Sequence, residues 1–199
     1  VDYLIDYEKV TTETLDTDAF DSAIMRPGTE AERQERNRAR QSQDEATLEK
    51  FRRLRQERQR ADRRQINDIQ RWWLQKMIES PRPLEEKMTL FWHHVFATGL
   101  VKNEHVLAAK NQIKMFRMNG MGDMTTILND LSRDPAMLFW LDNNENRNGE
   151  PNENYGRELL ELFSLGVGNY SEQDIKDASR AFTGWTFEQP PPLYPHGYY

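Results

Sequence analysis

The clearest structural signal in this 199-residue chain is the segment Ser80-Pro81-Arg82-Pro83-Leu84-Glu85-Glu86-Lys87-Met88-Thr89-Leu90-Phe91-Trp92-His93-His94-Val95-Phe96. Proline is tolerated in the first turn of a helix but not in its interior, so the two prolines end one helix and begin another. The second helix is expected to run from about residue 84 to residue 98. Its apolar face is wide, so it should lie centrally in the core.

Apolar residues recur at helical spacing on both sides of this segment. Between residues 47 and 77 they recur mostly every three or four positions, which predicts one long helix with a polar middle. Shorter helices are expected at 103–118, 123–132, 135–141, 153–165 and 172–182, with N-caps at Asp123, Asp134 and Ser171. No segment alternates with the period of two that is typical of a strand. The predicted fold class is all-α: a single irregular multi-helix domain with one long N-terminal helix and no sheet.

Composition predicts three parts along the chain. Residues 31–42 contain almost no apolar side chains, so they are expected to be a mobile linker or a fraying helix. The expected division is 1–46, an N-terminal segment with a charged linker; 47–186, the helical domain; and 187–199, a proline-rich loop. The chain starts without methionine and stops in that loop, so we expect it to be part of a longer protein, with the loop beginning a missing C-terminal part.

Composition also excludes several classes of function. The chain has no cysteine, which excludes disulfide scaffolds, thiolate zinc sites and cysteine nucleophiles. No apolar run is long enough to cross a bilayer, so no membrane-spanning helix is expected. Residues 30–71 carry 13 Lys and Arg against 9 Asp and Glu, or +4, within a chain of net charge −6. Such interleaved charges predict a solvated helix that neutralises itself through i, i+4 pairs, and not a nucleic-acid interface.

Four residues are candidates for core chemistry: His93, Glu86, Glu158 and Glu161. Adjacent histidines on a helix point about 100° apart, so at most one of His93 and His94 could bind a given ion. Glu86 shares a helix face with His93, and the other two glutamates would have to reach this site from a second helix. The simpler interpretation is that His93 is a buried histidine satisfied by one hydrogen bond and that His94 is a polar residue at the edge. Arg157 and Glu158 would then be either paired in a buried network or held at a boundary.

An asparagine-rich loop is the second candidate site. Oxygen-bearing side chains occupy alternate positions of a twelve-residue stretch that ends in glutamate, as in an EF-hand: Asp142, Asn144, Asn146, Asn148 and Glu153. If the protein binds Ca²⁺, we expect Asp142, Asn144, Asn146 and Glu153 to be the ligands. Arg147 replaces the usual turn glycine, so the affinity should be weak, roughly 10⁻⁴ to 10⁻³ M. The other interpretation is a turn in which asparagine side chains cap their own backbone. No other cofactor is indicated.

Several motifs resemble the bacterial domain-of-unknown-function 1800 family, in the family's order along the chain. They are the segment 82–99, the run Ser132-Arg133-Asp134-Pro135-Ala136-Met137, and a block with Arg157-Glu158-Leu159-Leu160-Glu161-Leu162 and Ala181-Phe182-Thr183-Gly184-Trp185. The resemblance runs from about Trp72 to Thr186, with Val95 where many members carry histidine and Phe163 where some do. It implies a longer bacterial protein whose activity is not established. Its genes often lie beside those of an exported, alkaline-phosphatase-like family, which implies the periplasm or cell envelope by association.

The sequence therefore predicts a helical module of a larger, envelope-associated bacterial protein that acts through protein–protein or interdomain packing. The reason is that large apolar and capping residues dominate its motifs. The expected partner is another protein or the rest of its own chain, with no nucleic acid and no membrane span. The alternative is a metal-dependent enzyme with a core site of His93, Glu86, Glu158 and Glu161, completed by the missing C-terminal region.

Overall fold

All regular structure in the described part of the chain is helical. The computed structural model describes residues 4, 6–11, 20, 28–96, 98–99, 102 and 106–186. Within these residues there are eight α-helices and no strand, which confirms the all-α prediction. The elements are η1 (Tyr7–Lys9), α2 (Glu30–Gln41), α3 (Glu45–Glu79), α4 (Pro83–Val95), α6 (Val106–Asn119), α7 (Met124–Leu131), α8 (Pro135–Trp140), η2 (Asn143–Glu145), α9 (Asn154–Glu158), the π-helix η3 (Leu159–Ser164) and α10 (Glu172–Ala181).

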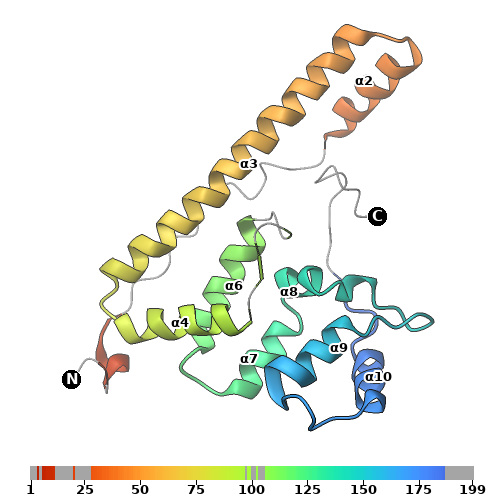
Figure 1. Cartoon of the computed structure of the whole chain (residues 1–199). Helices are drawn as coiled ribbons and strands as arrows, with labels where there is room; N and C mark the ends of the chain where they lie inside the picture. Colours follow the sequence, from red (N-terminus) through yellow and green to blue (C-terminus); the bar gives the residue numbers. More distant parts are fainter. Residues whose placement is uncertain are drawn as a thin grey trace.

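Helices α2 and α3 form an antiparallel hairpin that extends away from the rest of the molecule (Figure 1). A capping box starts α2, with the Thr29 hydroxyl accepting from the backbone N–H of Glu32 and the Glu32 carboxylate from that of Thr29. Lys50 of α3 pairs with Glu35 at 3.1 Å, and Arg58 pairs with Glu32 at 3.3 Å. Of the two alternatives for residues 31–42, the structure therefore shows the helix and not the linker.

The core lies among the shorter helices below the hairpin. Its buried residues come from the end of α4 through to η3: Phe96, Phe116, Ile127, Leu131, Met137, Leu141, Tyr155 and Phe163. A second small cluster joins the C-terminal half of α3 to α6. Its buried residues are Ile69, Val106 and Ile113. Among the described residues, this cluster attaches the hairpin to the body along the C-terminal part of α3.

Helix α4 lies where the sequence predicted, but its burial differs from the expectation. Only its C-terminal end enters the core, where Trp92 and Val95 pack with Phe96. Leu90 and Phe91 are exposed, whereas Glu85 and Glu86 are buried. The expectation that the apolar face lies centrally in the core therefore does not hold at Phe91. The reason is an arginine on α6 that turns the two carboxylates inward.

Candidate functional site

That arginine, Arg117, is the centre of a buried cluster of charges. Its Nε lies 2.7 Å from Glu86 Oε1 and 3.0 Å from Glu85 Oε1. Arg82 pairs with the other oxygen of Glu85 at 3.1 Å and donates to the backbone carbonyl of Val10 at 2.6 Å. Two arginines thus balance two glutamates, and the cluster ties the N-terminal residues to α4 and α6. In this arrangement Glu86 is engaged by a cation rather than by His93.

The His93 ring lies among aromatic rings from two neighbouring helices. Its centroid is 5.0 Å from that of Trp73 on α3 and 6.4 Å from that of Phe116 on α6, both in edge-on arrangements. Burial lowers the pKa of His93, and the nearby His94 lowers it further. Near neutral pH the ring is therefore uncharged, which suits a packing role between α3, α4 and α6.

Glu158 and Glu161 lie where α9 passes into the π-helix η3. The Glu161 carboxylate accepts a hydrogen bond from the Tyr170 hydroxyl at 2.7 Å. Across all the residues that the structure describes, no three His, Asp or Glu side chains are grouped so that they could hold a metal ion. The core site of His93, Glu86, Glu158 and Glu161 stays a prediction, which elemental analysis of the protein purified without chelator would test.

The π-helix itself was not predicted, and it changes which side chains reach solvent. The backbone N–H groups of Leu165 and Gly166 both donate to the carbonyl of Leu160, at 3.0 Å each. A π-turn accommodates one residue more than an α-turn, so the side chains after it rotate around the axis. Phe163 points into the core, with its ring centroid 5.1 Å from that of Phe96. Leu162 and Leu165, by contrast, are exposed.

Three exposed aliphatic residues form what we call the aliphatic patch: Leu162, Leu165 and Val167. Their exposed fractions are 65%, 50% and 77%. All three lie within six residues of chain, at the end of η3 and in the turn that follows. Gly166 makes this turn possible, because its φ of +81° is one that side-chain-bearing residues adopt only with strain.

The asparagine-rich loop is ordered by its own side chains, as one of the two interpretations predicted. The buried Asn146 amide donates to the backbone carbonyl of Ser179 at 2.8 Å and accepts from the N–H of Asn152 at 2.9 Å. Asn154 donates to the carbonyl of Leu141 at 3.0 Å. These bonds join the loop to α10 and close it over the end of α8.

Each of the four predicted calcium ligands has another partner or role in this loop. Asp142 Oδ1 lies 2.6 Å from Lys102 Nζ, and Glu153 lies 3.4 Å from Arg157. Asn146 is used within the loop, and Asn144 donates to Glu145 at 3.1 Å. The left-handed residue of the loop is Asp142, at φ 56°, and not the residue in the EF-hand glycine position. The calcium site stays a prediction.

Comparison with known proteins gives one match. A family model described as "Protein of unknown function (DUF1800)" matches residues 6–197. The chain belongs to the DUF1800 family. No curated protein and no solved structure matches it. The DUF1800 match extends the resemblance seen in the motifs to nearly the whole chain, the α2–α3 hairpin included, and it leaves the activity of the family open.

The core of this DUF1800 protein also contains a row of hydrogen-bonded polar side chains that the motifs did not indicate. The Thr98 hydroxyl donates to Gln112 Oε1 at 2.6 Å, and Gln112 Nε2 donates to Asp134 Oδ2 at 2.7 Å. Burial raises the pKa of Asp134 to about 6, against the opposing effect of hydrogen bonds from the Met137 N–H and Gln112. The sequence indicated Asp134 only as an N-cap, because nothing local shows that α6 covers it.

Proposed function

We propose that this chain is a helical module that acts by packing against a partner protein or against another part of its own chain. The observation that supports the proposal is the aliphatic patch at the end of the π-helix. Aliphatic side chains gathered at one exposed place are stabilised when a partner removes them from water, and such patches commonly mark interaction sites. Leu162 lies in the π-helix, and Leu165 is its C-cap residue.

The polar groups beside the patch favour the same use. Next to Leu162, Glu161 is bonded to Tyr170. One helical turn earlier, the guanidinium group of Arg157 donates two hydrogen bonds to the carboxylate of Glu172, at 3.1 and 3.0 Å. These polar side chains already have partners within the chain, so a docking protein need not supply them. An apolar centre with a satisfied polar border is the usual composition of a protein interface.

Site-specific photo-crosslinking in the source cells tests the proposal. A photo-crosslinking amino acid is placed at Leu162 or Val167, with exposed Gln173 on α10 as the matched control position. We expect Leu162 and Val167 to give the same defined adduct, with one partner protein or one peptide of the same chain, and Gln173 not to give it. Equal adducts at all three positions, or none at Leu162 and Val167, would contradict the proposal.

We also propose that this module is located in the cell envelope. It is supported by the gene neighbourhood that the family resemblance implies. Among the described helices none has the length and the apolar character that crossing a bilayer requires. Cell fractionation with an antibody against the chain tests the location, and recovery in the cytoplasmic fraction alone would contradict it.

A further inference from the structure

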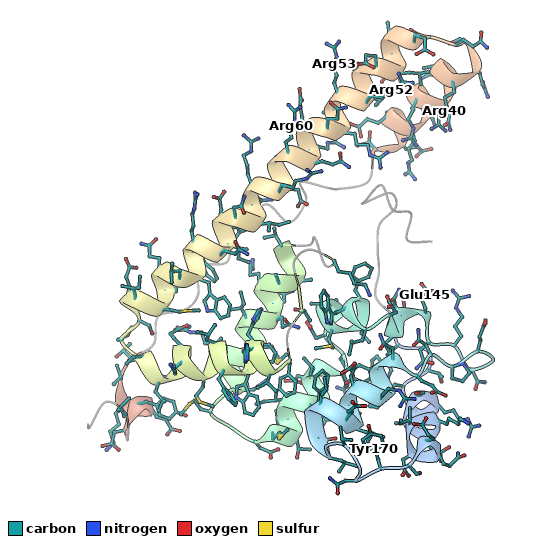
Figure 2. All side chains as sticks on the ribbon, in the orientation of Figure 1. Arg40, Arg52, Arg53, Arg60, Glu145 and Tyr170 are labelled. Carbon is teal, nitrogen blue, oxygen red and sulfur yellow. The ribbon has the colours of Figure 1, made fainter. Side chains whose placement is uncertain are left out.

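One face of α3 is uniformly exposed and free of acidic residues over most of the helix. At 100° per residue, six arginines between residues 52 and 71 fall within about one third of the helix circumference, with amide side chains between them. They are Arg52, Arg53, Arg60, Arg63, Arg64 and Arg71, and all are exposed. We call this surface the outer face of α3. Figure 2 shows Arg53 and Arg60 projecting from the side of α3 that faces away from the body.

The acidic residues between Glu49 and Asp68 on α3 are either buried or lie at the borders of this face. Asp62 is buried. Glu49 lies at the N-terminal end of the face and pairs with Arg53 at 3.3 Å, and Asp68 lies at one edge, 4.0 Å from Arg71. Glu57 occupies the same edge. The structure therefore separates charges that the sequence interleaves, and it leaves the middle of the face positive.

Three arginines occupy that middle: Arg60, Arg63 and Arg64. None of their guanidinium groups has an ion pair or a hydrogen bond with any residue that the structure describes. Guanidinium groups bind phosphate and carboxylate oxygens in bidentate fashion, so three unpaired ones in a row suit an anionic surface.

The same face ends in two exposed aliphatic residues. Leu74 and Ile78 continue its line at i and i+4, and their exposed fractions are 58% and 76%. From Arg52 to Ile78 the face is straight and about 39 Å long. Its composition thus changes from cationic to apolar along one line.

We propose that the outer face of α3 binds the surface of an anionic phospholipid bilayer. Arginines contact the headgroup phosphates, and Leu74 and Ile78 enter the boundary with the acyl chains. A basic helix face lying flat on a bilayer gains from both anionic lipid and buried apolar area. A nucleic-acid duplex is the weaker fit, because its phosphates curve away from a straight helix and offer nothing to the two aliphatic side chains. This proposal does not depend on the aliphatic patch at η3.

Vesicle co-sedimentation of the complete chain tests the proposal. The probe is phosphatidylcholine vesicles with about 30 mol% phosphatidylglycerol, compared with pure phosphatidylcholine. We expect binding to the anionic vesicles alone, weakened as salt rises because screening shortens the range of the charges. The triple variant Arg60→Gln, Arg63→Gln, Arg64→Gln should bind about a hundredfold more weakly, at roughly fivefold per arginine.

Two further variants make the result specific. Arg33→Gln, Arg38→Gln, Arg40→Gln removes the same charge from exposed positions of α2 and should weaken binding far less. Leu74→Ser with Ile78→Ser should weaken vesicle binding at least about tenfold and leave any binding of a DNA duplex unchanged. Circular dichroism checks that each variant is folded. No binding to anionic vesicles, equal losses in the two arginine variants, or binding of duplex DNA alone would overturn the proposal.

Discussion

Asp134 illustrates how much one residue's environment can add to its local role. Its carboxylate accepts from the Met137 N–H at 3.0 Å, which is the N-cap bond that the sequence predicted for α8. Gln112 adds a bond from another helix and removes the carboxylate from water. Because the folded pKa, about 6, lies above the ordinary value of 3.8, the folded state holds the proton more tightly than the unfolded state.

The free energy of unfolding should therefore depend on Asp134 between about pH 4 and pH 6. The contribution of the protonated form is fully present below the unfolded pKa and is lost as the pH rises through the folded pKa. Asp134→Asn keeps an N-cap acceptor and removes the titration. The stability of the wild type relative to this variant should fall by about 2 to 3 kcal/mol from pH 4 to pH 7. Urea unfolding of both proteins at four pH values measures this difference in stability. A difference that does not change with pH would contradict the raised pKa of Asp134.

At the scale of elements, the sequence predicts the helices well and their faces less well. Helices α3, α7, α8 and α10 begin and end within three residues of the expected positions, because proline, capping residues and helical spacing are local signals. Helix α4 was placed correctly, yet its buried side depends on Arg117, which comes from elsewhere in the chain. The π-helix η3 and the aliphatic patch were missed for the same reason. The rotation of the side chains there follows from the π-turn, and spacing in the sequence does not show that turn.

The contact between α9 and α10 depends on the absence of a side chain at Gly156. A Cβ atom there would lie 2.5 Å from Ser179 Oγ and 3.0 Å from Ser179 N. Gly156→Ala should destabilise the protein by about 1 to 3 kcal/mol through overpacking. Gly149→Ala is the matched control, because a methyl group at Gly149 meets nothing within 4 Å. Thermal or denaturant unfolding compares the two, and equal stabilities would show that α9 and α10 can move apart freely.

The asparagine-rich loop allows its structural role to be separated from calcium binding. Asn146→Ala leaves the Ser179 carbonyl and the Asn152 N–H without their buried partner, so the free energy of unfolding should fall by about 1 to 3 kcal/mol without calcium. Calcium at about 10 mM, ten times the upper end of the expected range, should raise the melting temperature of the wild type only if the loop also binds the ion. A wild-type melting temperature unchanged by calcium leaves the capping role alone. An Asn146→Ala protein as stable as wild type would contradict that role.

At the scale of the whole molecule, two regions of opposite charge are set apart. Residues 50–71 carry 9 Lys and Arg against 3 Asp and Glu, or +6, and residues 142–186 carry 4 against 9, or −5. The sequence shows these totals, but it does not show that the positive charges gather on one side of α3. That arrangement arises because Asp62 turns inward while Arg60, Arg63 and Arg64 turn outward. The two proposed contact surfaces, the aliphatic patch and the outer face of α3, therefore lie on different parts of the molecule.

Because α3 contacts the body near one end, a small rotation there would move the other end of the hairpin over a longer distance. The helix is held to the body near Ile69, and from there to Glu45 it extends for about 36 Å at 1.5 Å per residue. A rotation of only about 10° at that pivot would move the far end of the hairpin by roughly 6 Å. A small repacking of Trp73 against His93 at the pivot would thus be magnified into a displacement as large as one turn of helix.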